Sequence, residues 1–240
     1  MTRASLPVIL ILMFFSIIGC SDKDSKDTSR LTLELRHTVD GEPLIFNTEL
    51  YENEAGNSYK VTGLRYYLSG IKLWNGDQLM YTSEEIFYID GEEEITKLEL
   101  EGVEEGEYSS MTYLIGIVDE ENIIGNLPNE DIHDQMVWPE PMGGGYHFMK
   151  MEGYYYDENN EQFGFAIHQG TSIGRIEGEL VGDFSYFEED NNLKLNCNMN
   201  NLFDEPEVYN FEIDGAHTMG VEYLMGKIAQ NGADILEFDN

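Results

Sequence analysis

The stretch LTLELRH, residues 31–37, decides the fold class. Leucine stands at every second position, with Thr32, Glu34 and Arg36 in between. Because successive side chains of a strand point to opposite faces, this alternation predicts a strand with one buried face. The same period of two recurs along the chain, for example over residues 64–68, 163–168 and 193–198.

Turn-forming pairs separate these segments, among them Asp40-Gly41, Asn75-Gly76 and Asp90-Gly91. Many short strands with this spacing are typical of an antiparallel sandwich or barrel. We therefore predict an all-β fold, an antiparallel β-sandwich formed by residues 31–240 as a single domain. Residues 119–145 show little periodicity, and a stretch of this kind is usually functional or mobile.

One segment near the C-terminus has helical rather than strand spacing. Val221, Leu224, Met225 and Ile228 stand at i, i+3, i+4 and i+7, and Gly232 follows as a stop signal. The sandwich should therefore carry one short C-terminal α-helix.

The N-terminal segment is predicted to be a targeting signal and not part of the fold. Arg3 precedes an apolar run of about thirteen residues, which is too short to span a bilayer and is typical of a signal peptide. The run ends in Gly19-Cys20, which resembles a bacterial lipobox and implies cleavage after residue 19 and lipid attachment to Cys20. Residues 20–30 then form a polar tether, similar to the export tags of surface lipoproteins in Bacteroidetes.

The charge balance excludes one class of partner. With 13 Lys+Arg against 47 Asp+Glu, the net charge is −34. Residues 1–19 contain one basic residue, Arg3, and no acid, so their removal changes the charge to −35. No basic surface is available to bind nucleic acid, and attachment to a membrane would depend on the lipid on Cys20. Cys197 is then the one remaining cysteine, and we interpret it as a strand residue of the core, with a thiol ligand as the less favoured alternative.

The chain contains none of the local sequence motifs of hydrolases, phosphate-binding loops or zinc proteases, so we do not predict an enzyme. The five histidines are more informative. His37 and His168 close alternating segments, where strand ends can converge at one rim of a sandwich. His217 precedes the predicted helix, and His133 is interpreted as a hydrogen-bonded structural residue.

Two histidines have methionine neighbours at strand spacing. Residues His147, Met149 and Met151 alternate, so they should share one face of a strand, and His217-Thr218-Met219 repeats the unit. Imidazole together with thioether suits copper, above all Cu(I). The alternative is that these methionines simply fill the core.

Several of these segments, taken together, resemble the MbnP-like family, extracytoplasmic proteins related to the partner protein of methanobactin operons. The resemblance begins with residues 31–37, 41–44 and 63–73, continues through 106–108, 114–117, 136–138, 145–153 and 168–170, and ends with 217–219. It implies an all-β domain that binds copper, Cu(I) or Cu(II), through histidines. It also implies a tryptophan that a dihaem partner enzyme oxidises to kynurenine.

Transferred onto this chain, the resemblance gives four metal ligands, His37, His147, His168 and His217. It gives Trp138 as the tryptophan, and Met149 and Met219 stand beside the metal by their spacing. The chain departs from relatives that carry Trp-x-Trp, because Pro139 and Glu140 follow Trp138. Residues 171–174 also lack the cysteine that such relatives have, so the resemblance supports imidazole ligands more directly than tryptophan oxidation.

The sequence thus predicts a lipid-anchored copper-binding protein of the outer membrane or cell surface, exposed to the periplasm or the exterior, that captures or handles copper. Its partner would be a dihaem peroxidase-like enzyme or an outer-membrane transporter. Binding through ordinary histidines should weaken as the pH falls towards about 6.5. The alternative is a metal-free surface module that binds glycans or proteins through Trp74 and Tyr154-Tyr155-Tyr156. A hydrolase using a carboxylate pair ranks last.

Overall fold

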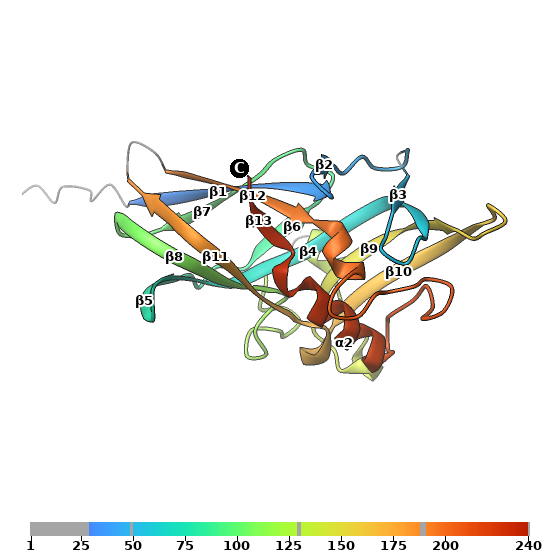
Figure 1. Cartoon of the computed structure of the whole chain (residues 1–240). Coiled ribbons are helices and arrows are strands. Elements are labelled where there is room, and N and C mark those ends of the chain that lie inside the picture. The colour runs from blue at the N-terminus through green and yellow to red at the C-terminus, as the bar shows by residue number, and fades with distance from the viewer. Residues whose placement is uncertain (1–28, 49, 129–130, 188–190, 240) are drawn as a thin grey trace, which may run out of the picture.

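The computed structural model describes residues 29–48, 50–128, 131–187 and 191–239. The predicted signal peptide, Cys20 and most of the tether lie outside these residues. The described part of the chain forms two β-sheets and a few short helices (Figure 1), which confirms the predicted all-β sandwich.

The smaller sheet is built around β1 (Arg30–Val39), the strand of the opening sequence. Its order is β13 (Leu236–Phe238), β12 (Asn192–Asn198), β1, and then both β7 (Thr96–Glu101) and β2 (Glu42–Pro43) along the free edge of β1. The pairing of β1 with β12 is parallel, whereas the other pairs are antiparallel. The prediction of a purely antiparallel sandwich is therefore wrong at this one pair, because alternation reports which face is buried and not the direction of the neighbouring strand.

The larger sheet is organised by the 18-residue strand β4 (Ser58–Asn75). Along one edge of β4 lie β3 (Tyr51–Glu52), β6 (Phe87–Asp90) and β5 (Gln78–Thr82). The opposite edge carries β9 (His147–Tyr156) on its first half and β8 (Gly106–Ile115) on its second half. β10 (Gln162–Gly170) extends the sheet beyond β9, and β11 (Ile176–Tyr186) extends it beyond β8. The sheet therefore forks, and two pairs of strands, the β9–β10 hairpin and the pair β8–β11, diverge from one long strand.

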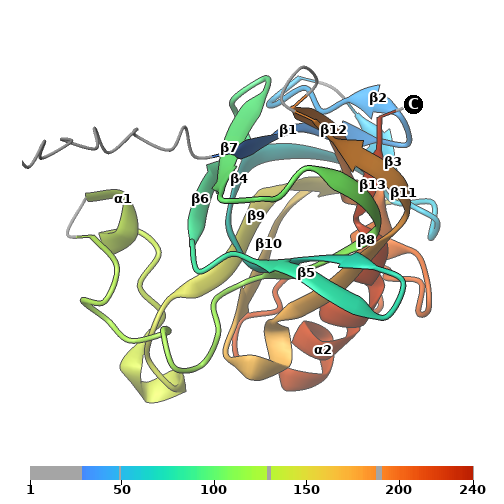
Figure 2. The ribbon, with the colours of Figure 1, turned by 90° about the vertical axis from the view of Figure 1, so that its left-hand side faces the viewer.

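The two sheets enclose a common core of alternating strand residues. The inward side chains of β1 pack against those of β4, as Leu31, Leu33 and Tyr66 illustrate, each no more than 1% exposed. Seen end-on in Figure 2, the sheets curve around this interior, and α2 (Glu222–Asn231) lies on the side of β10. α2 begins one residue after the predicted Val221 and ends at Asn231, directly before Gly232, so the predicted C-terminal helix is confirmed.

The remaining helical pieces are short. They are α1 (Asp131–Asp134) and the 3₁₀ turns η1 (Glu140–Met142), η2 (Ser172–Gly174), η3 (Met199–Phe203) and η4 (Gly232–Asp234). A second, smaller group of buried side chains, which includes Tyr67, Tyr146 and Phe148, holds the loop of residues 117–146 against the larger sheet. Of the helices in the described ranges, none is both long and apolar enough to cross a membrane.

Candidate metal centre

The irregular loop before β9 ends in a short antiparallel pairing that brings Trp138 beside His147. The backbone N–H of Trp138 donates to Gly145 O at 2.8 Å, and that of His147 donates to Met136 O. The indole is completely buried, and its ring centre lies 4.8 Å from that of His147 in an edge-on arrangement. The end of the loop of residues 119–145 therefore positions a tryptophan against the first residue of β9.

Glycine is required where this loop turns back. Gly143, Gly144 and Gly145 have φ values of +116°, +70° and +83°, a region that favours glycine. Within the turn, Met142 O accepts a hydrogen bond of 3.0 Å from the indole Nε1 of Trp138. The buried N–H of the indole is thus satisfied by the loop itself.

Gly170, at the end of β10, is required for a different reason. A Cβ atom at this position would lie 2.5 Å from Cε3 of Trp138, closer than real contacts allow. The indole therefore packs directly on the backbone of Gly170. This contact is the physical reason for a glycine two residues after His168.

His147 is buried, with 6% exposure, and is oriented by the backbone. Its Nδ1 donates to Met136 O at 3.1 Å, so a neutral ring keeps its lone pair on Nε2. Burial lowers the pKa of His147 to about 4. The imidazole is therefore neutral at physiological pH, which is the form that binds a metal.

His168 faces His147, with ring centres 5.1 Å apart and ring planes at 89°. Its Nε2 donates to the Glu152 carboxylate at 2.8 Å, which leaves the lone pair of the neutral ring on Nδ1. Burial lowers the pKa of His168, and the hydrogen bond to Glu152 opposes part of that shift. The Thr218 hydroxyl accepts from His168 N at 2.9 Å and donates to His168 O at 2.8 Å, which fixes the backbone of the histidine.

A β-bulge decides which face of β9 carries His147. His168 pairs with Lys150, but Gly170 pairs with His147, so β9 has one extra residue between these two pairs. Met149 and Met151 belong to the main core and are no more than 1% exposed, whereas His147 contacts His168 on the opposite face. The expectation that His147 shares a face with Met149 and Met151 is therefore wrong, because the bulge interrupts the alternation. Met149 is a core residue, as the alternative interpretation held.

His217 and Met219 lie at the rim of this group. His217 forms a β-bridge with Ala166, which places it on the face of β10 that carries His168, and it is exposed. Met219 is partly buried in the turn that leads to α2.

His37 is placed elsewhere. It lies on the inward face of β1, with 6% exposure, and its Nε2 shares a hydrogen bond of 2.9 Å with the Tyr66 hydroxyl of β4. Tyr66 pairs with Met149 on the core side of the larger sheet, so this sheet separates His37 from His168. The two strand ends do not converge at one rim, and His37 is not brought together with the other histidines.

The other interpreted residues are structural. His133 shares a hydrogen bond of 2.8 Å with the Tyr67 hydroxyl and stacks on its ring. Cys197 is fully buried in the core, in register with His37, as predicted. Tyr154 and Tyr156 flank Lys60 near the start of β4, whereas Trp74 lies fourteen residues further along, near the other end of this strand. These aromatic residues therefore do not form one stacking surface.

The imidazole pair fits a transition metal. A metal about 2.0 Å from one nitrogen of each ring lies about 3.2 Å from each ring centre, so two ligating rings can have centres up to about 6.4 Å apart. The 5.1 Å between His147 and His168 lies within this limit. Over the described ranges there is no group of three or more His, Cys, Asp or Glu side chains with the spacing of a metal site. Two imidazoles without carboxylate ligands suit copper or zinc and do not suit calcium or magnesium.

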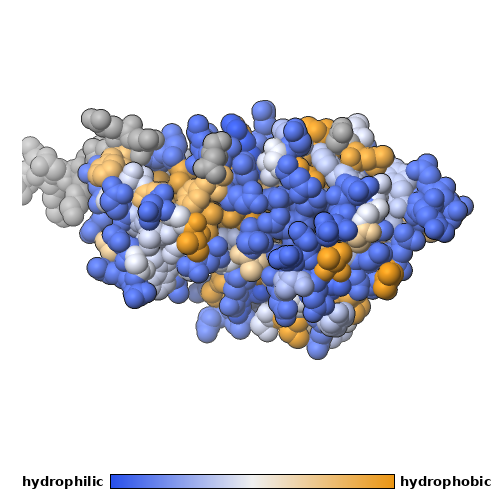
Figure 3. All heavy atoms as spheres, viewed as in Figure 1, coloured by the Kyte–Doolittle hydropathy of each residue, from blue (hydrophilic) through white to orange (hydrophobic). Residues whose placement is uncertain are grey.

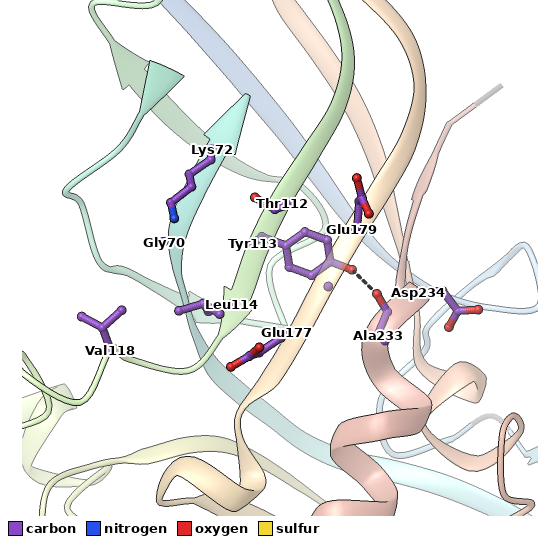
Figure 4. Close-up of a pocket in the computed structure, with 11 residues that line it drawn as sticks. Gly70, Lys72, Thr112, Tyr113, Leu114, Val118, Glu177, Glu179, Ala233 and Asp234 are labelled. Atoms are coloured by element: carbon purple, nitrogen blue, oxygen red, sulfur yellow. Dashed lines mark hydrogen bonds between the residues drawn. The ribbon is translucent and has the colours of Figure 1, made fainter. Parts of the chain in front are cut away.

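One hollow of the surface lies away from this pair. This hollow (Figure 4), of about 600 Å³, lies between β4, β8 and β11 and is lined by polar side chains such as Lys72, Glu177 and Asp234. It contains no histidine. Among its lining residues, Tyr113 donates to Ala233 O at 3.4 Å, so this contact belongs to the packing of η4.

Comparison with known proteins shows the family of this chain. The family model named MbnP matches residues 28–220. The chain belongs to the MbnP family. Among solved structures, MbnP from Methylosinus trichosporium is similar, with a TM-score of 0.48 and 12% identity over 75% of this chain and 79% of that chain. No curated protein sequence matches. The matched range includes all five histidines and Trp138, so it does not distinguish among them.

Sequence reasoning missed three residues of this site, namely Glu152, Gly170 and Thr218. Glu152 could have been found from the hairpin register. In the β9–β10 hairpin, residues that are equally far from Asn159 in the sequence pair with each other, as Lys150 and His168 do. Folding the sequence at the turn-forming run of residues 157–161 would have placed Glu152 diagonally opposite His168.

Proposed function

We propose that this protein binds copper through His147 Nε2 and His168 Nδ1, and that it captures or handles copper and is not an enzyme. The observation that carries the proposal is the pair of facing imidazoles, each held neutral and each hydrogen-bonded through its other nitrogen. Copper ligation requires this protonation state.

Each neighbouring group has a part in preparing the pair. Met136 O fixes the ring of His147, and the Glu152 carboxylate fixes the ring of His168 and increases its basicity. Trp138 closes one side of the site and excludes water from His147. A bound copper ion would supply a positive charge that the two neutral rings do not neutralise.

The cellular setting is part of the same proposal. A lipid on Cys20 would hold the protein at the outer membrane or cell surface, where a dihaem peroxidase-like enzyme or an outer-membrane transporter would be its partner. The surface of the protein is suited to contact with water. Hydrophilic side chains dominate the face in Figure 3, and the chain carries a net charge of −34. This charge attracts metal cations but does not select copper.

Intact mass of the native protein would show oxidation of Trp138 to kynurenine as a small mass gain.

The test is a copper titration of the full chain in detergent, with His147→Ala and His168→Ala as the site variants. We expect each variant to lose at least about a hundredfold in copper affinity, because one of two ligands is removed. His37→Ala is the matched control, since His37 is equally buried but stands outside the pair. It should keep the stoichiometry and affinity, although the cavity and the lost partner of Tyr66 should lower the stability by about 3 kcal/mol. Unchanged copper binding in both site variants would refute the proposal.

The second candidate is a metal-free glycan-binding surface, now restricted to Tyr154 and Tyr156 beside Lys60. Glycan-array binding by protein that is free of metal would favour it over copper handling.

A further inference from the structure

The methionines of the described residues fall into two groups. Six are buried and no more than 3% exposed, namely Met111, Met136, Met149, Met151, Met199 and Met225. Three are not buried. They are Met80 on β5, Met142 in η1 and Met219 before α2, with 38% and 43% exposure for Met80 and Met142. Filling the core explains the first group and does not explain the second.

Met142 and Met219 come from two loops that touch above the imidazole pair. The carbonyl of Met142 accepts the hydrogen bond from Trp138, and its side chain extends towards Gly220. Its terminal methyl carbon lies 3.1 Å, and its sulfur 3.9 Å, from the position that a Cβ of Gly220 would occupy. Met219 directly precedes Gly220 in a turn closed by the bond from Val221 N to Thr218 O at 2.9 Å. Two thioethers therefore stand on adjoining loops.

His217 joins them from the same turn. It is exposed, and its bridge with Ala166 places it on the face of β10 that carries His168. Thr218, between His217 and Met219, is bonded twice to the backbone of His168. The segment that carries the imidazole and the thioether is thus fixed directly to one member of the inner pair.

We propose that Met142, Met219 and His217 form a surface site that takes up Cu(I) and passes it to His147 and His168. This inference rests on the proposed copper function and adds an entry site to it. Two thioethers with one imidazole are a soft donor set that favours Cu(I) over zinc, calcium or magnesium. The metal remains Cu(I) during the transfer, so no electron moves, and the thioether sulfurs have no proton to release. Donors of the outer site are replaced by the two imidazole nitrogens of the inner pair.

The first experiment measures the rate of transfer. Full-length protein in detergent is mixed anaerobically with the coloured Cu(I)–bicinchoninate complex, and the loss of colour is followed by stopped flow. Met142→Leu/Met219→Leu keeps the apolar volume and removes both sulfurs, and it should slow transfer about tenfold without changing the final stoichiometry. Met80→Leu is the matched control, because this methionine has similar exposure on a distant strand, and it should load at the wild-type rate. A double variant that loads as fast as wild type, or an equal slowing by Met80→Leu, would overturn the entry site.

The second experiment separates this inference from the proposed function. In the variant His147→Ala/His168→Ala, with ¹³C-methyl methionine, Ag(I) serves as a diamagnetic probe for a soft-metal site. The methyl resonances of Met142 and Met219 should shift on addition of Ag(I), and that of Met80 should not. Failure of the inner pair would appear as unchanged copper capacity in this variant, whereas failure of the entry site would appear as unshifted resonances of Met142 and Met219.

Discussion

His37 and His147 are equally buried, at 6% exposure, and burial lowers the pKa of each to about 4. Their surroundings differ. His37 contacts a tyrosine hydroxyl between two sheets, and its Nδ1 has no hydrogen-bond partner. His147 is oriented by a carbonyl and faces a second imidazole and an indole. Burial and pKa therefore do not distinguish these two histidines, whereas the groups around them do.

The largest difference between the surroundings of His147 and His37 is expected from a substitution at Gly170. This glycine packs against Trp138 beside His147, whereas His37 has no such neighbour among the described residues. Gly170→Ala would force a Cβ against the Trp138 ring, so we expect a loss of about 2 kcal/mol in the free energy of unfolding, measured by urea denaturation. Copper affinity should fall as well, because the displaced indole packs on His147. Gly164→Ala is the control on the same strand, since its nearest non-neighbouring atom is 4.0 Å away, and its stability should be unchanged or slightly higher. Equal effects of the two substitutions would contradict this account of the site.

A smaller effect is expected at Glu152, the carboxylate that His168 has and His37 lacks. Glu152→Gln keeps an acceptor oxygen but removes the charge, so copper affinity in the same titration should weaken about tenfold. Glu99→Gln, an exposed carboxylate paired with Arg30 on the other sheet, should leave the affinity unchanged. An equal loss of copper affinity in both variants would contradict this prediction. It would mean that the Glu152 carboxylate acts only through its charge and not through its hydrogen bond to His168.

The smallest change is expected from pH, and it revises the sequence-based expectation of weakening near about 6.5. A lowered pKa in the folded protein means that the neutral ring persists as pH falls and is lost only when pH approaches that lower value. Protonation of His147 should therefore weaken copper binding only as the pH approaches about 4, and protonation of His168, whose pKa is also lowered by burial, should act only below its ordinary value of about 6.5. Titrations at fixed ionic strength check this, and a proton-competition midpoint near 6.5 would contradict the buried pair.

The sequence predicted the strands well because alternation records burial directly. Residues 31–37 and 163–168 lie in β1 and β10, and the helical spacing from Val221 gives α2. The parallel partner of β1 was not predictable, since nothing in the period of two encodes strand direction. For the candidate site, the family resemblance pointed to His147, His168 and Trp138, which the structure places together, but one bulge moves His147 to the other face of β9. His37 was misplaced because an inward position near a strand end resembles a rim position in the sequence.

The fork at β4 has a consequence for the mechanical behaviour of the molecule. β8 with β11, and β9 with β10, are joined to the larger sheet through β4, each pair of strands along its own half of β4. Among the named strands of the described residues, no ladder joins β8 or β11 to β9 or β10, so β4 is the strand through which the two halves are hydrogen-bonded to each other. A distortion around His147 and His168 would therefore reach the other half along β4 or through α2, which contacts both β10 and β11.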